Sequence, residues 1–271
     1  MRSRALPSIW CSNMLIQWDR TIAWDLDAEH ALGVLSVGST EQHSNYLPLG
    51  TDSILGQHLV REAAEKAKAR VLMLPSQCIG FSPHHRAFPG VITLRNDVMV
   101  EYLTEVCESA FRAGLPRLLI VNSHGGNQTA LQGVVNRLGS EFGHQVVLVR
   151  YWDLIADKID GIRRSQPGGM GHAGEFETSL MLHFAPELVD TERIDVRPPA
   201  KGDAWHHPDM FAKNRVYRYI PFDTYSDLGN IGQAHLASKE EGARLSQLIT
   251  DKLAELMEFE YGYLSLKADS K

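Results

Sequence analysis

The sequence predicts an α/β fold in which a mostly parallel β-sheet lies between two layers of helices, a three-layer α/β/α sandwich. Two observations predict it. Short apolar runs alternate with longer segments whose apolar residues recur at helical spacing, the order typical of strand–helix units in a parallel sheet. Apolar residues make up 44% of the 271 residues and charged residues 22%. A chain of this size and composition can bury the core of one large α/β domain.

Four apolar runs predict buried strands, at residues 31–37, 70–74, 117–121 and 145–150. Helical patterns lie between these runs and near the end of the chain, at residues 53–69, 96–113, 128–142 and 238–259. A further apolar helix is expected to begin near residue 175. The alternation up to residue 150 predicts helices on both faces of the sheet.

Three stretches have no regular pattern. Residues 1–16 are expected to form an N-terminal arm, either mobile or docked between subunits. Residues 18–29 predict a short helix or turn, and residues 186–238 predict long irregular loops. We therefore expect residues 1–271 to form a single domain that carries this arm and these loops.

Composition excludes several functions. The formal net charge is −6 and no cluster of Lys and Arg is present, so nucleic-acid binding is not expected. No window approaches the roughly 18 apolar residues of a membrane span, and residues 1–15 lack a clear leader pattern, so we expect a cytoplasmic protein. The three cysteines are widely spaced, which argues against a disulfide framework and against a thiolate zinc site.

The segment GSTEQHSNYLPLGTD, residues 38–52, directly follows the first predicted strand, where a parallel strand delivers functional groups. Glu41 and His43 are two residues apart, so in an extended backbone their side chains project to the same side. One oxygen and one nitrogen ligand suit zinc, manganese or iron. Asp52 follows a bend and is placed to return as a bridging carboxylate. The alternative is a solvated loop in which Asp52 caps the next helix.

Three other segments carry candidate site residues. His124 follows the strand at 117–121 and is a candidate metal ligand, while Gly125 and Gly126 let the backbone approach a substrate or turn sharply into the next helix. The loop at 80–94 is rich in His, Pro and Gly, and we expect Ser82 and His85 near substrate, ahead of His84.

The segment GHAGEFETSLML, residues 171–182, places His172 on a loop and Glu175 and Glu177 in the first turn of a helix, where carboxylates also suit the helix dipole. The two glutamates point about 200° apart, so at most one is expected to face the site.

The segment at 38–52 resembles the creatininase (creatinine amidohydrolase) family pattern, in which Gly-Ser-x-Glu-Gln-His is followed by Leu-Pro-x-x-x-Asp. Three further stretches agree in order: FSPHHRAFPGVITL at 81–94, VNSHGGN at 121–127 and GHAGEFETSLML at 171–182. The resemblance runs from about residue 18 to residue 182, with a looser tail. The chain is identified as a member of this family other than creatininase itself, which implies a creatininase-like α/β fold.

This resemblance implies two divalent metal ions per chain, zinc, manganese or iron, held by Glu41, His43, Asp52 and His124, with Asp52 bridging. Creatininase completes the second metal with a Glu at the position of Gly126, so this chain needs a substitute ligand.

We rank Glu175 first as that substitute, because creatininase has an apolar residue there. Creatininase also keeps the Glu that corresponds to Glu177, for which we expect a catalytic role. His172 aligns with a creatininase histidine that moves protons and is the expected general acid/base. Trp152 lies in a Tyr-Trp-Asp string also seen in creatininases, and we expect it to contact substrate.

The implied reaction is attack by a hydroxide shared between two metal ions on the C–N bond of a cyclic amide or formamide in a small polar metabolite. The Tyr of creatininase that contacts creatinine is replaced by Gly125, so creatinine is not the expected substrate.

Alternatives are a hydrolase that opens a keto-carbocycle such as an inositol-derived ketone, a mononuclear zinc hydrolase, or a metal-binding maturation or assembly protein with little catalysis. The family also implies a homo-oligomer, a hexamer by resemblance.

Overall fold

The computed structural model describes residues 15–268. Its centre is a five-stranded sheet in the order β1-β3-β2-β4-β5, in which every neighbouring pair is parallel. The strands are β1 (Leu15–Gln17), β2 (Leu32–Val37), β3 (Val71–Met73), β4 (Leu118–Asn122) and β5 (Val146–Arg150). The four predicted strands are confirmed to within about two residues at each end.

The first strand was not predicted. Leu15 and Ile16 pair with Val71 and Leu72 of β3, so the end of the predicted arm belongs to the sheet. A three-residue edge strand is too short to show an alternating pattern, which is why the sequence did not reveal it. Residues 1–14, the rest of the predicted arm, lie outside the described residues.

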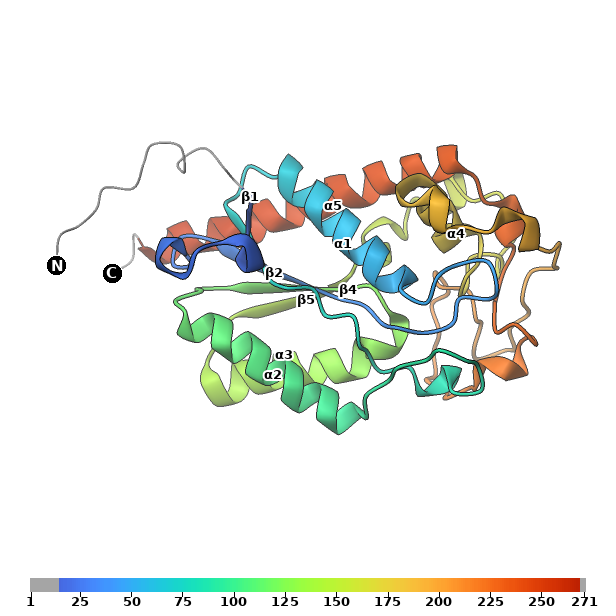
Figure 1. Ribbon diagram of the computed structural model, residues 1–271, viewed down its shortest axis with the longest axis horizontal. Coiled ribbons are helices and arrows are strands. Elements are labelled where there is room, and N and C mark those ends of the chain that lie inside the picture. The colour runs from blue at the N-terminus through green and yellow to red at the C-terminus, as the bar shows by residue number, and fades with distance from the viewer. Residues whose placement is uncertain (1–14, 269–271) are drawn as a thin grey trace.

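Helices cover both faces of the sheet (Figure 1), which confirms the three-layer arrangement. One layer contains α1 (Thr51–Lys66), α4 (Glu175–Phe184) and α5 (Lys239–Ala268), and the other contains α2 (Asn96–Arg112) and α3 (Gln128–Phe142). Each strand supplies both cores through alternating side chains. In β4, Leu119 and Val121 pack under α1 and α5, whereas Leu118 and Ile120 pack against α2 and α3.

The segment between α4 and α5 contains four short 3-10 turns and no α-helix or strand within the part that the structure describes, in agreement with the predicted irregular loops. Figure 1 shows these loops at the same end of the molecule as the segments that follow β2 and β4. Backbone contacts tie them there, since the Ile231 amide donates to the His172 carbonyl at 2.7 Å. The loops therefore cover the end of the sheet where the sequence motifs converge.

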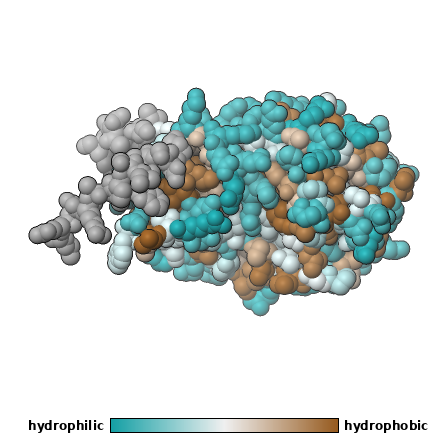
Figure 2. All heavy atoms as spheres, turned by 45° about the horizontal axis from the view of Figure 1, so that its top comes forward, coloured by the Kyte–Doolittle hydropathy of each residue, from teal (hydrophilic) through white to brown (hydrophobic). Residues whose placement is uncertain are grey.

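Most of the visible surface in Figure 2 is hydrophilic, with hydrophobic residues in scattered groups. Among the helices that the structure describes, none combines the length and the apolar character needed to cross a bilayer. Both cysteines in the described range, Cys78 and Cys107, are free thiols.

Helix α1 lies close to the sheet at Gly56. A Cβ atom at this position would lie 2.5 Å from the Ser36 Oγ atom and 2.6 Å from the Ser123 Oγ atom. Ser36 belongs to β2 and Ser123 directly follows β4, so the missing side chain lets the helix rest against both strands. This contact holds the first turn of α1, with Asp52, next to the carboxyl ends of β2 and β4.

We expect Gly56→Ala to lower the free energy of unfolding by about 1–3 kcal/mol, because the added methyl group overlaps both hydroxyls. Gly139→Ala in α3 is the matched control. Its Cβ would find its nearest atom at 3.9 Å, so alanine should raise stability by about 0.5–1 kcal/mol through helix propensity. Urea unfolding of both variants measures the difference, and equal effects would contradict the close approach.

Candidate active site

The site is assembled by two neighbouring parallel strands that end at the same level. Val37, the last residue of β2, is in register with Asn122, the last residue of β4. The Ser123 amide continues this pairing by donating to the Val37 carbonyl at 3.0 Å. The segments that leave the two strands therefore begin side by side, which brings His124 to the loop that carries Glu41 and His43.

Asp52 lies at the centre of the cluster. Its Oδ1 atom is 3.1 Å from Nε2 of His43, and its Oδ2 atom is 3.1 Å from Nδ1 of His124. The carboxylate sits in the first turn of α1 and is only 2% exposed. One carboxylate thus faces two imidazoles from different motifs, as a bridging ligand would.

Glu41 is completely buried and faces two further imidazoles. Its Oε1 atom is 3.1 Å from Nε2 of His85, and its Oε2 atom is 3.2 Å from Nε2 of His124. Neither contact has hydrogen-bond geometry, so both oxygens of Glu41 are buried without a hydrogen-bond partner. Carboxylate oxygens and imidazole nitrogens gathered in this way are the ligand types that zinc takes in proteins.

Glu177 enters the cluster from the first turn of α4. Its Oε2 atom accepts a hydrogen bond from the Ala173 amide at 2.6 Å and lies 4.0 Å from Nε2 of His43. Ala173 has a positive φ of 50°, an unusual conformation for alanine. The Tyr46 hydroxyl holds it by donating to the Ala173 carbonyl at 2.5 Å. This strained turn therefore aims the Glu177 carboxylate at the cluster.

His172 has a defined orientation. Its Nε2 atom is 2.7 Å from the Gln42 carbonyl oxygen, which can only accept, so Nε2 carries the proton. The free lone pair is then on Nδ1, which lies 3.7 Å from Oε1 of Glu41. Burial, reinforced by His43 and His85, lowers the pKa of His172 well below its usual value. His172 therefore presents a neutral nitrogen with a free lone pair to the cluster.

The buried carboxylates raise the pKa of two neighbouring histidines. Burial opposes charge on His43, but the Asp52 carboxylate outweighs it and raises the His43 pKa to about 9. Burial likewise opposes charge on His124, whereas Glu41 and Asp52 raise its pKa well above the usual value. Burial raises the pKa of Glu177 to about 7. Divalent cations would supply this charge more fully than protonated imidazoles.

Three groups of side chains each offer ligand atoms that lie within 4.8 Å of one another. They are Glu41 with His43 and His172, Glu41 with His84 and His124, and His43 with Asp52 and Glu177. Imidazole nitrogens mixed with carboxylate oxygens suit zinc, manganese and iron. Together with the unpartnered oxygens of Glu41 and Asp52, this donor set fits divalent metal ions.

Comparison with known proteins gives the family. The family model for creatininase, described as creatinine amidohydrolase, matches residues 17–257. The chain is 30% identical over 225 residues to the mycofactocin precursor peptide peptidase of Mycobacterium ulcerans (strain Agy99), covering 80% of this chain and 81% of the relative. This chain belongs to the creatininase family. It is therefore a hydrolase of the metal-dependent amidohydrolase type, as the motifs implied.

Two further matches agree with membership of the creatininase family. The creatinine amidohydrolase of Pseudomonas putida is 26% identical over 244 residues, which cover 84% of this chain and 89% of the relative. A crystal structure of creatinine amidohydrolase has the same fold, with a TM-score of 0.79 at 24% identity over 91% of this chain and 98% of that one. Other creatininase structures with this fold are described as a Zn-Zn type and as an Mn form.

The structure does not place Glu175 among the ligands of this creatininase-family site. Its carboxylate turns back from the start of α4 and accepts hydrogen bonds from the amides of Arg164 at 2.6 Å and Ser165 at 2.8 Å. Both oxygens are thus occupied by the preceding loop. The first-ranked substitute ligand is therefore corrected, and of the two glutamates Glu177 is the one that faces the cluster.

Trp152 is 3% exposed and packs edge to face against Tyr151, with ring centroids 5.1 Å apart, inside the hydrophobic core. Its contact with substrate stays a prediction. Ser82 is fully buried as well, and its Oγ atom contacts Ser39 Oγ and lies 3.3 Å from Nε2 of His124. Ser82 therefore packs directly against the His124 ring of the cluster.

For His85, Gly125 and Gly126, contact with substrate stays a prediction. His85 faces Glu41, and a Cβ atom at Gly125 would meet nothing within 4 Å. Gly126 faces His124 and His84. His84, ranked behind its neighbour in the sequence, is thus part of the cluster.

Sequence reasoning missed three residues that organise the site. Asn127 clamps two motifs together, because its Oδ1 atom accepts from the Phe81 amide at 2.8 Å and its Nδ2 atom donates to the Gly38 carbonyl at 2.9 Å. Gln42 contacts His85 through its side chain. Phe222, from the irregular loops, covers the cluster, with ring centroids 4.4 Å from His85 and 5.2 Å from His172. Asn127 and Gln42 stand inside the quoted motifs, whereas Phe222 gave no signal.

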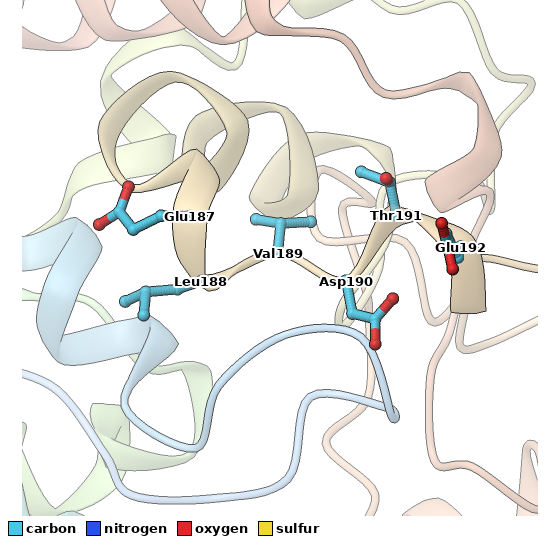
Figure 3. A pocket seen from close by; sticks show the side chains of 6 residues that line it. All are labelled: Glu187, Leu188, Val189, Asp190, Thr191 and Glu192. Carbon is cyan, nitrogen blue, oxygen red and sulfur yellow. The ribbon is translucent and has the colours of Figure 1, made fainter.

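Two surface hollows lie away from the cluster. The one in Figure 3 has a volume of about 430 Å³ and is lined by the contiguous residues 187–192. The other, of about 560 Å³, is lined by residues 76–79, Leu94, Val98 and Tyr102. Neither hollow is lined by a residue of the cluster, so neither one marks the candidate active site.

Burial and the Glu175 carboxylate raise the pKa of a second buried carboxylate, that of Glu241. Glu241, at the start of α5, is 5% exposed, and both of its carboxylate oxygens are buried without a hydrogen-bond partner. Burial, followed by the nearby Glu175 carboxylate, raises the Glu241 pKa to about 9. The folded chain therefore keeps this proton over a pH range in which the unfolded chain has lost it, so stability should fall between pH 4.5 and about 9.

We expect Glu241→Gln to remove this loss, because glutamine has no proton to release. The variant should match the wild type near pH 4 and exceed its free energy of unfolding by about 1 kcal/mol or more at pH 8. Urea unfolding across this range measures the difference. Parallel stability curves for the two proteins would contradict the raised pKa.

Proposed function

We propose that this chain hydrolyses an amide C–N bond with the help of two divalent metal ions, zinc, manganese or iron. The observation that carries the proposal is the convergence of buried carboxylates and imidazoles on Asp52, whose two oxygens face different histidines. Glu41 and His124 would hold one ion, His43 and Glu177 the other, and Asp52 both. Ions held there supply an acidified water and polarise the carbonyl of the substrate.

The residues around this centre have distinct tasks. His172 accepts a proton at Nδ1, since its Nε2–H is committed to the Gln42 carbonyl, and can return that proton to the departing amine. Phe222 covers His85 and His172 and limits the access of bulk water. The lowered pKa of His172 keeps its ring neutral near pH 7, so the lone pair on Nδ1 is free.

The substrate class is a small polar molecule with a cyclic amide or formamide group, the substrates that the creatininase resemblance implies. A peptide amide is a second candidate for two reasons. The Mycobacterium ulcerans peptidase is 30% identical to this chain and the creatinine amidohydrolase 26%, and a Cβ atom at Gly125 would meet nothing within 4 Å. A panel of lactams, formamides, short peptides and cyclic ketones tests the class. Turnover of the ketones alone would overturn the amide proposal.

We propose that the chain works as a homo-oligomer, for which the hexamer implied by the family is the starting hypothesis. Large aromatic side chains are exposed on the irregular loops, including Trp205, Tyr217 and Tyr219, and such residues are enriched at protein interfaces. A cytoplasmic location stays a prediction from composition.

Asp52→Asn tests the shared ligand. The metal content should fall from about two ions per chain to one or none, and amide hydrolysis should fall on the order of 1,000-fold, because the bridging charge is lost. Elemental analysis after dialysis measures the first effect. Glu175→Gln is the matched control and should keep both ions, since its carboxylate binds the amides of Arg164 and Ser165. An Asp52→Asn chain that keeps two ions would contradict the shared role and favour a different metal arrangement.

His172→Ala separates proton transfer from metal binding. We expect both ions to remain, with kcat lowered about 100- to 10,000-fold, the range typical of a lost general acid or base. Loss of an ion in this variant would instead make His172 a metal ligand. Steady-state kinetics together with metal content distinguish the two results.

A further inference from the structure

The half of the cluster that contains Glu41 and His124 carries fewer protein ligands than a metal ion takes up. Glu41 is fully buried, and neither of its carboxylate oxygens has a hydrogen-bond partner. Asp52 adds one more oxygen near His124. A divalent ion held by these three residues still has a coordination position to fill, because zinc sites are four-coordinate.

Gly126 adjoins this remaining coordination position. A Cβ atom there would collide with Nε2 of His124, and it would lie 2.5 Å from the Phe81 carbonyl oxygen and 2.7 Å from Cε1 of His84. No side chain fits at this position without displacing its neighbours. The space that a ligand from Gly126 would need is taken by the His84 ring, which enters from the 3-10 turn Pro83–His85.

The His84 ring presents its nitrogen-bearing edge to this space, because Cε1 lies between the two ring nitrogens. One of these nitrogens lies within 4.8 Å of ligand atoms on both Glu41 and His124. The ring also stacks on His124, with an interplanar angle of 7° and centroids 5.5 Å apart. His84 therefore stands beside the pair with a donor atom at metal-binding range.

The neighbouring His85 is excluded as this ligand by its hydrogen bonds. The Gln42 Oε1 atom accepts from the Ser44 amide at 2.7 Å, which fixes the amide orientation, so Gln42 Nε2 donates to Nδ1 of His85 at 3.0 Å. Nε2 of His85 then carries the proton, and this N–H faces Glu41. A protonated nitrogen has no lone pair for a metal.

We propose that His84 is a ligand of the metal ion held by Glu41, Asp52 and His124, in the space left free by Gly126. The inference rests on the proposed function, since it completes one of the two metal sites described there. A neutral imidazole in this place makes the site less negative than a carboxylate would. Imidazole also favours zinc or iron over manganese, so this site should prefer the former.

The test compares two substitutions at His84. His84→Leu keeps much of the side-chain volume but has no ligand atom, whereas His84→Glu keeps a ligand. The wild type should hold two ions after dialysis, His84→Leu about one, and His84→Glu two. In cobalt titrations followed by visible absorption, one of the two binding events should weaken at least about 100-fold in His84→Leu. His30→Leu, at an exposed histidine, controls for the loss of an imidazole elsewhere.

The outcomes separate the two proposals. Two ions with unchanged affinity in both the wild type and His84→Leu would overturn the role of His84 and leave the proposed function intact. Equal loss of metal in His84→Leu and His84→Glu would show a packing role for His84 and also overturn this inference. A wild-type chain that binds no metal would overturn the proposed function itself.

Discussion

The burial of three carboxylates in one cluster is the constraint on which the site depends. Glu41, Asp52 and Glu177 are at most 4% exposed, and burying unpaired charge costs several kcal/mol per group. Without a metal ion, neighbouring histidines compensate this charge by holding a proton, since the carboxylates raise the pKa of His43 and His124 despite burial. Divalent cations would supply the charge instead and would leave the imidazoles neutral and able to act as ligands. Under the proposed function, the same cations would activate water for amide hydrolysis.

The scaffold and the first part of the site follow from the sequence. Apolar runs are a strong signal for buried parallel strands, and parallel strands must bring their carboxyl ends to one edge. Glu41, His43 and His124 were therefore predictable as neighbours, and the structure brings them together with Asp52. Strand β1 escaped prediction because three residues carry no periodic pattern.

The remaining site residues depend on contacts that sequence cannot reveal. Helical geometry predicted that at most one of Glu175 and Glu177 faces the cluster, but it did not say which one. Two loop amides donate hydrogen bonds to the Glu175 carboxylate and hold it away from the cluster. Of two adjacent histidines, the Gln42 amide fixes the proton of His85 on Nε2, which is why we propose His84 as the ligand. Trp152 stands in a family string, yet packing places it in the core. Tautomers and side-chain packing of this kind are set by tertiary structure.

The central claim is that two cations share Asp52 within this cluster. Anomalous X-ray diffraction from crystals grown with zinc or manganese tests it most directly, with data collected on both sides of the metal absorption edge. The account predicts two anomalous peaks roughly 3.5–4 Å apart, one on each side of the Asp52 carboxylate. A single peak would contradict the shared arrangement, and no peak among Glu41, His43, Asp52 and His124 would contradict the metal centre as a whole.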